Sequence, residues 1–76
     1  MPALPVLSGS EIVRVFEALG WQQVRQRGSH IILVREGQIV TLSVPDHKEV
    51  ARGTLRGLIR LSGLTVAEFV DASESL

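Results

Sequence analysis

Two tight-turn signals near the middle of the chain constrain its fold more than any other feature. Gly28-Ser29 suits a two-residue type II′ hairpin turn, which has glycine at its first position, and Glu36-Gly37 suits a second two-residue turn. The segments on either side are short, and the second and third of them are rich in aliphatic residues. They are residues 21–27, 30–35 and 39–44. This pattern predicts three consecutive antiparallel strands.

Helical periodicity flanks the predicted strands on both sides. Ser8 or Ser10 is a suitable cap for a first helix that stops at Gly20. The apolar residues on one side of this helix are Ile12, Phe16 and Leu19, with Val13 and Val15 beside them. A second helix is predicted from about Thr54 to Ser62. A third, short helix opens with the capping box Thr65-Val-Ala-Glu68 and runs through Phe69 and Val70. The predicted class is therefore α+β, in the order α-β-β-β-α with a short C-terminal helix.

Strand alternation divides the predicted sheet into a dry face and a polar face. The cross-strand pairs expected from the two turns are Arg27 with His30, Arg25 with Ile32, Ile32 with Thr41, and His30 with Ser43. The dry face, which the helices would cover, holds Val24, Ile31, Leu33, Val40, Leu42 and Val44. The other face holds Gln23, Arg25, Arg27, His30, Thr41 and Ser43, with Ile32, Val34 and Ile39 towards its far end. A slip of one residue would turn His30 into the core.

The formal net charge of zero conceals a basic middle of the chain. Residues 21–60 carry seven basic and three acidic side chains, a net of +4, whereas residues 1–20 carry −1 and residues 61–76 carry −3. Because the local field steers a polyanion, this distribution is compatible with nucleic-acid binding. Arginines that merely solvate the surface would give the same pattern.

Composition excludes several classes of site. The chain has no cysteine, which rules out a disulfide, a thiolate nucleophile and a cysteine-based zinc site. No apolar run approaches the length that spans a membrane, and the N-terminal MPALPVL lacks the basic region of a signal peptide. We therefore expect a single cytoplasmic domain that has no cofactor and no bound metal.

His30 is the residue on which the functional interpretation depends. Histidine transfers protons near neutral pH, and guanidinium groups match phosphate oxygens. An imidazole beside arginines and hydroxyls on an open sheet therefore suits cleavage of RNA, which carries its own nucleophile in the 2′-hydroxyl. In the alternative interpretation, His30 is only a polar residue that begins a strand. His47, which follows Pro45 and Asp46, is either a turn residue or a second proton carrier.

Several motifs together resemble those of the HicA (YcfA-like) family, the small toxins of type II toxin–antitoxin systems. The resemblance covers residues 8–70. Its most specific pieces are Gly28-Ser29-His30, Val44-Pro45 with His47 two residues on, Gly53-Thr54-Leu55-Arg56, and Gly63-Leu64. It implies a fold like that of a double-stranded-RNA-binding domain, with both helices on one face of a three-stranded antiparallel sheet. The whole chain, residues 1–76, would form one such domain with residues 1–7 as an N-terminal extension.

The resemblance also implies an activity and a partner. Members of the family act as mRNA interferases, and the histidine of the Gly-Ser-His motif, here His30, is catalytic. Gly28 and Ser29 would position it, while His47 holds a recurring position without a firm role. The usual partner is a HicB antitoxin, which masks the histidine and helps to repress the operon. Contact with a membrane is not expected, and contact with DNA is expected only through the toxin–antitoxin complex.

These arguments give one catalytic candidate, His30, and a set of candidates for contacting RNA. The RNA-binding candidates are Arg25, Arg27, Ser29, Thr41, Ser43, His47 and Lys48. A non-catalytic RNA-binding module and a protein-interaction module remain the alternative functions. Many members of the family are distinctly basic and this chain is neutral, so its RNA binding would depend more on local contacts.

Overall fold

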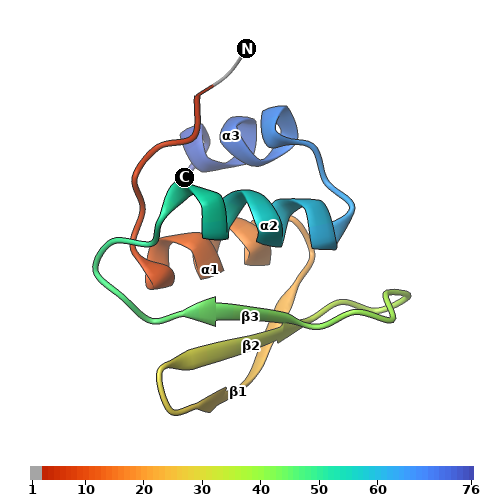
Figure 1. Cartoon of the computed structure of the whole chain (residues 1–76). Helices are drawn as coiled ribbons and strands as arrows, with labels where there is room; N and C mark the ends of the chain where they lie inside the picture. The colour runs from red at the N-terminus through yellow and green to blue at the C-terminus, as the bar shows by residue number, and fades with distance from the viewer. Residues whose placement is uncertain (1–2) are drawn as a thin grey trace.

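The computed structural model describes residues 3–76, so the first two residues of the predicted N-terminal extension lie outside the described residues. Its elements are α1 (Gly9–Ala18), β1 (Gln22–Arg27), β2 (His30–Val34), β3 (Leu42–Pro45), α2 (Arg52–Ser62) and α3 (Val66–Glu74). The strands form one antiparallel sheet in the order β1-β2-β3 (Figure 1). The predicted α+β class and element order are thus confirmed.

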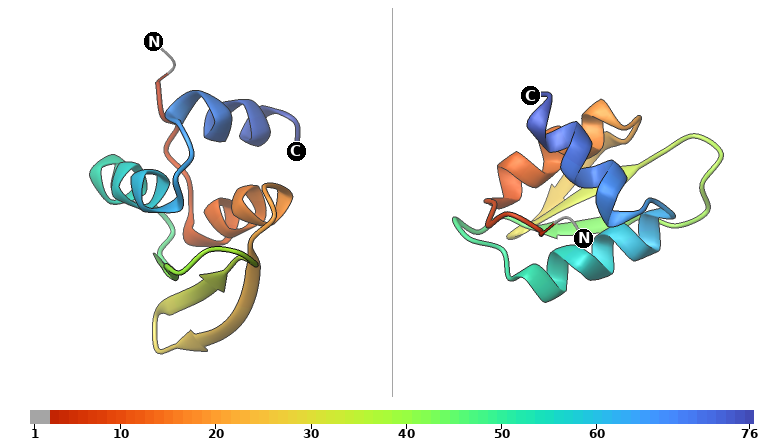
Figure 2. Two further views of the ribbon diagram at one scale, coloured as in Figure 1. Left: turned by 90° about the vertical axis from the view of Figure 1, so that its right-hand side faces the viewer. Right: turned by 90° about the horizontal axis from the view of Figure 1, so that it is seen from above.

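The molecule is built in three layers. Helices α1 and α2 lie on one face of the sheet, and α3 packs on α1 and α2 without contacting a strand (Figure 2). Helix α1 crosses all three strands, whereas α2 contacts only the edge strand β3. No helix within residues 3–76 covers the opposite face of the sheet. This is the arrangement expected of a fold like a double-stranded-RNA-binding domain.

Aromatic side chains join the helical layers at the centre of the core. The rings of Phe16 on α1 and Phe69 on α3 lie 5.2 Å apart, and Trp21 meets Phe16 edge-on at 6.3 Å. All three side chains are almost fully buried. Burying an aromatic or large aliphatic side chain contributes about 1.5–3 kcal/mol. Phe69 therefore helps to attach α3 to the rest of the fold, together with Val66, Val70 and Ala72, which pack against the same core.

The predicted capping box at Thr65 is present, and Ser8, one of the two cap candidates for the first helix, also forms a capping box. Ser8 accepts a hydrogen bond from the backbone N–H of Glu11, whose carboxylate accepts one from the N–H of Ser8. Thr65 and Glu68 form the same pair at the start of α3. These bonds satisfy N–H groups that a helix start otherwise leaves without partners.

Helix α2 begins at Arg52, two residues before the predicted start. Its N-cap residue Ala51 supplies no side-chain hydrogen bond. Instead, the Nε of Arg52 donates to the carbonyl of Leu4 over 2.9 Å, which ties the N-terminal segment to the helix. The helix ends where predicted, at Ser62, and its C-cap residue Gly63 has a φ of 82°.

The predicted register of the third strand is wrong by two residues. Ile32 lies opposite Ser43 and His30 lies opposite Pro45. The reason is the turn at Gly37, where φ is 85° and the N–H of Gln38 donates to the carbonyl of Arg35. Positive φ at the second central residue alone is the signature of a type II turn, which does not close a tight hairpin.

The connection between β2 and β3 is therefore a seven-residue loop, residues 35–41, and β3 starts at Leu42. Ile39 and Thr41, which were predicted to lie in the third strand, belong to this loop, and Ile39 is fully exposed. Because the error is an even number of residues, each residue of β3 keeps its predicted face. Leu42 and Val44 are buried, as expected.

A β-bulge in β1 overturns the predicted positions of Gln23 and Val24. The register shifts between Gln23 and Arg25, so that Gln23 pairs with Leu33 on the helix side, and Val24 is 50% exposed instead of buried. In a regular strand Trp21 and Arg25 would point to the same face. Since Trp21 is buried in the core and Arg25 is exposed, one extra residue has to be inserted between them.

Two glycines within α2 have no structural role in the fold. Gly53 and Gly57 are exposed, and a Cβ built at either position meets nothing within 4 Å. Their φ angles are not positive. Each costs the helix about 0.5–1 kcal/mol relative to alanine. Within residues 3–76, no helix has both the length and the apolar character needed to cross a membrane.

Candidate functional site

The turn before His30 has the predicted geometry. Arg27 and His30 are cross-strand partners, so only Gly28 and Ser29 lie between the strands. Gly28 has a φ of 58° while Ser29 has no positive φ, which matches a type II′ turn. The glycine is needed for its conformation, because a Cβ at this position would meet nothing within 4 Å. The turn places His30 at the first position of β2.

Contacts from the segment after β3 fix this turn. The N–H of Asp46 donates to the carbonyl of Ser29 over 2.7 Å. The side-chain amide of Gln26 donates to the carbonyl of Gly28 at 3.1 Å and to the Asp46 carboxylate at 3.3 Å. These bonds hold the backbone immediately before His30.

The same segment is fastened to the start of α1. The N–H of Gly9 donates to the carbonyl of His47 over 2.9 Å. A Cβ on Gly9 would overlap the carbonyl oxygen of Pro45 and lie 2.9 Å from the Cα of Asp46. Only glycine allows the helix to approach this closely, so the helical layer supports the turn that carries His30.

His30 lies on the open face of the sheet and is exposed. Arg27 lies directly opposite it on β1, and Pro45 lies opposite it on β3. Side chains that face each other across an antiparallel pair have Cβ atoms about 4.5–5.5 Å apart, and diagonal neighbours about 7–8 Å. Arg25, which pairs with Ile32, is such a diagonal neighbour. The bulge lies upstream of both arginines, so they share a face.

The other candidates divide into near and far groups. Ser29 precedes His30 in the turn. Ser43 lies opposite Ile32, so it is a diagonal neighbour of His30 and not its direct cross-strand partner as predicted. Thr41 is in the loop beyond Leu42, at the far end of β3, so the structure separates it from His30. It lies about four residues along the strand from Pro45, or roughly 13 Å at 3.3 Å per residue.

His47 and Lys48 lie in the exposed loop that joins β3 to α2. This loop begins immediately after Pro45, so it flanks the His30 end of the sheet. The backbone carbonyl of His47 is used in the contact with Gly9, while its imidazole is exposed. No hydrogen bond in the described part of the chain joins the two imidazoles.

The basic side chains at the site are free to bind a ligand. Arg25, Arg27 and His30 take part in none of the side-chain hydrogen bonds found among residues 3–76. Two guanidinium groups and one imidazole on an exposed surface suit a phosphodiester, because arginine binds phosphate oxygens and histidine transfers protons. In the same span, no group of three or more His, Asp and Glu side chains is arranged to hold a metal ion.

Sequence reasoning missed Gln26 and Asp46 as residues that build the site. Gln26 is the polar residue of β1 that pairs with Ile31 on the helix side, where an apolar residue would be expected. A glutamine at a position that faces the helices breaks the alternation of apolar and polar residues, and this break could have indicated a structural role for Gln26. The partner, Asp46, is 20 residues away, and only the fold brings the two side chains together.

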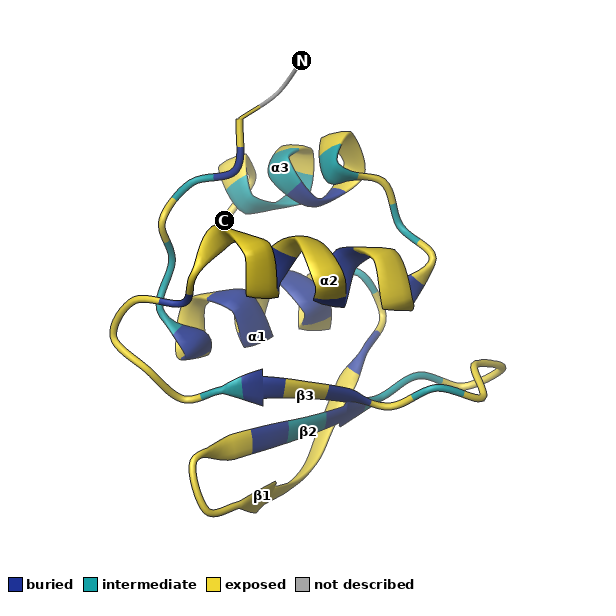
Figure 3. Ribbon diagram, viewed as in Figure 1, coloured by how far each residue is buried: buried dark blue, intermediate teal, exposed yellow. Residues whose placement is uncertain are grey.

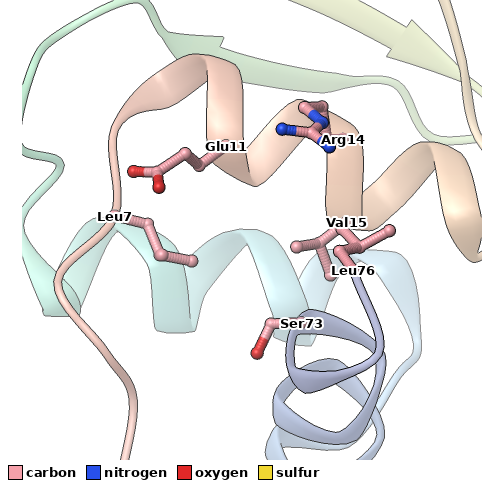
Figure 4. Close-up of a pocket in the computed structure, with 6 residues that line it drawn as sticks. All are labelled: Leu7, Glu11, Arg14, Val15, Ser73 and Leu76. Carbon is pink, nitrogen blue, oxygen red and sulfur yellow. The ribbon is translucent and has the colours of Figure 1, made fainter.

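The molecule also has an open pocket in its helical layers, away from the open face of the sheet (Figure 4). Its volume is about 210 Å³, and its lining is formed by Leu7, Glu11, Arg14, Val15, Ser73 and Leu76. This pocket lies between α1 and α3, so α1 and the sheet separate it from the open face. Its Glu11 carboxylate is occupied by the capping box. It therefore contributes nothing to the site around His30.

Two comparisons with known proteins identify relatives of this chain. The family model described as "HicA toxin of bacterial toxin-antitoxin" matches residues 9–64. A solved structure, a toxin–antitoxin complex from Streptococcus pneumoniae, contains a chain that is 30% identical, with a TM-score of 0.68. The similarity covers 76% of this chain and 98% of that one. None of the curated proteins matches the chain.

Proposed function

Because this chain belongs to the HicA toxin family of bacterial toxin–antitoxin systems, we propose that it is an mRNA interferase with His30 as its catalytic residue. The observation that supports the proposal is an exposed imidazole on the uncovered face of the sheet, directly opposite Arg27. RNA is a polyanion, and guanidinium groups bind its phosphates. The proposed substrate is mRNA in the cytoplasm.

In the proposed reaction His30 moves a proton while the arginines bind the phosphate. The 2′-oxygen of a nucleotide loses its proton and attacks the adjacent phosphorus, and the bond from phosphorus to the 5′-oxygen of the next nucleotide breaks. That 5′-oxygen takes up a proton, and the upstream fragment ends in a 2′,3′-cyclic phosphate. His30 acts as the base in the first proton transfer or as the acid in the second, and water completes the other.

The magnitude of the histidine contribution follows from general acid–base catalysis. A positioned proton carrier accelerates such a step by a factor on the order of 10² to 10⁴. Arg25 and Arg27 would stabilise the additional negative charge on the phosphate oxygens in the transition state. The proposed reaction requires no metal ion, because the substrate supplies the nucleophile and the protein supplies the proton carrier and the cations.

The proposed regulator is a HicB-like antitoxin that covers the same face. The related pneumococcal chain comes from a toxin–antitoxin complex, which supports a protein partner of this kind. Ile32 and Val34 are half-buried residues on the open face, beside Arg25. Aliphatic side chains on an otherwise polar face suit contact with a protein better than contact with RNA. A partner bound there would exclude RNA from His30, so antitoxin and RNA would compete.

The test is incubation of the purified chain with an unstructured RNA in the presence of EDTA. The chain has only two histidines, so His47→Ala is the matched control for His30→Ala. We expect His30→Ala to abolish cleavage while antitoxin binding is retained, and His47→Ala, at a candidate RNA contact, to reduce cleavage far less than His30→Ala does. Binding of RNA by the wild-type chain without cleavage would instead indicate a non-catalytic RNA-binding module. Neither binding nor cleavage would indicate a protein-interaction module.

A further inference from the structure

A row of arginines lies along the exposed side of α2, outside the proposed catalytic site. Arg52, Arg56 and Arg60 follow each other at intervals of four residues, which places them on successive turns along one side of the helix. All three are exposed, and α2 contains no acidic residue. We infer that this arginine row is a second contact for the RNA backbone. The inference rests on the proposed function, because the RNA is the strand that His30 would cleave.

The charges of the three helices determine which side of the molecule attracts RNA. Helix α2 carries three positive and no negative side chains, and α3 carries three negative and no positive ones. Helix α1 carries Glu11, Arg14 and Glu17. A polyanion is therefore attracted to the α2 side of the molecule and repelled from α3. Since exposed charges are screened beyond about 10 Å in 0.1 M salt, the attraction acts on phosphates that lie close to α2.

The fold places the arginine row next to the open face. Helix α2 lies over β3, and β3 is an edge strand of the sheet (Figure 2). The chain passes from Pro45, opposite His30, to the first turn of α2 through residues 46–51. Lys48 is the exposed cation of this connection, which also carries the exposed carboxylates of Asp46 and Glu49. An RNA strand that crosses the open face at His30 and passes the β3 edge therefore reaches Lys48 and then Arg56.

Arg56 and Arg60 are the members of the row that are available to phosphate. The Nε of Arg52 is engaged by the carbonyl of Leu4, which gives this residue a structural role. Neither Arg56 nor Arg60 takes part in a side-chain hydrogen bond among residues 3–76. Both point away from the buried side of α2, which consists of Leu55, Leu58, Ile59 and Ser62.

The glycines of α2 are consistent with a ligand at this surface. At 100° per residue, Gly53 and Gly57 lie on the most outward part of the helix, beside the arginines. In Figure 3 this outer surface of α2 is exposed along its length. No close contact among residues 3–76 requires glycine at either position. Because neither glycine has a side chain, no atoms project from the helix beside the arginines, and a phosphate can approach the guanidinium groups from that side.

The test is equilibrium binding of a fluorescently labelled, unstructured RNA to His30→Ala protein, in which the RNA stays intact. We expect Arg56→Gln/Arg60→Gln to weaken binding at low salt. Each phosphate contact on a single strand contributes about 0.7 to the slope of log K against log[salt], so the loss of two contacts lowers the slope by about 1.4. The ratio of the Kd of the arginine variant to that of its parent should then shrink about sevenfold between 50 and 200 mM salt.

A charge-restoring variant controls for net charge. Asp71→Asn/Glu74→Gln on α3 returns the double arginine variant to its original net charge without changing α2. We expect its RNA affinity to stay low. Recovery of wild-type affinity would show that only net charge matters and would overturn the inference, as would unchanged affinity in the double arginine variant.

A dinucleotide substrate separates this inference from the proposed function. A dinucleotide fills the site at His30 but is too short to reach α2, so the arginine variants should cleave it at the wild-type rate and lose efficiency only on long RNA, through KM. Equal losses on both substrates would overturn the arginine row as a separate contact. If the wild-type chain cleaves neither substrate, the proposed function fails, while a binding loss specific to Arg56 and Arg60 still supports the contact.

Discussion

Substitution of Gly9 by alanine is expected to destabilise the fold and to displace the segment that holds the His30 turn. The new Cβ would overlap the backbone carbonyl of Pro45, and no side-chain rotation can relieve a clash with backbone. Overpacking of this kind costs about 1–3 kcal/mol. Weakening of the hydrogen bond from Gly9 to His47 adds about 0.5–1.5 kcal/mol. The higher helix propensity of alanine offsets up to about 1 kcal/mol.

These terms sum to a loss between about 0.5 and 4.5 kcal/mol, so we expect about 2 kcal/mol in the free energy of unfolding for Gly9→Ala, or roughly 8–16 °C in Tm for a domain of this size. Urea and thermal unfolding followed by circular dichroism measure it. The matched control is Gly57→Ala, which meets nothing within 4 Å in a helical conformation and should stabilise the fold by about 0.5–1 kcal/mol. Equal effects of the two substitutions would refute the close approach of α1 to Pro45.

Three further predictions concern stability. Ser8→Ala removes one capping box and should cost about 1 kcal/mol in urea unfolding. Hydrogen bonds from the N–H and hydroxyl of Ser8 lower the pKa of Glu11, and those of Thr65 lower the pKa of Glu68. The contribution of these ionised carboxylates to the free energy of unfolding is complete above the ordinary glutamate pKa of 4.5 and is lost as the pH falls below that value. Glu11→Gln should therefore reduce the fall in Tm on the acid side of a Tm–pH profile. His30→Ala should change stability by less than about 0.5 kcal/mol, because an exposed side chain loses little packing, and a larger loss on melting would show that it is packed.

The features predicted correctly from the sequence are those set by neighbouring residues. The turn at Gly28 requires positive φ at one position, the cap at Ser8 needs only a hydroxyl before the helix, and the capping box at Thr65 needs only residues three apart. The face of His30 follows from this turn, since Arg27 and His30 must pair across it. The core face of the sheet likewise follows from alternation within β2 and β3.

The features that were missed depend on contacts across the fold. The conformation of the turn at Gly37 depends on φ at Glu36, which a Glu-Gly pair does not determine, and this changed the register of β3 and moved Thr41 away from the site. The bulge in β1 reconciles a buried Trp21 with an exposed Arg25, a conflict that appears only when both are placed in the same sheet. The support of the turn by Asp46 likewise depends on tertiary structure.

The central claim is that the exposed imidazole of His30 transfers a proton during cleavage of RNA. The most direct measurement is the single-turnover cleavage rate of His30→Ala at saturating protein, with and without imidazole added to the buffer. The account predicts a fall on the order of 10² to 10⁴ with unchanged circular dichroism, and partial recovery that rises with imidazole concentration. A rate within about tenfold of wild type, too small a loss for a missing proton carrier, would contradict it.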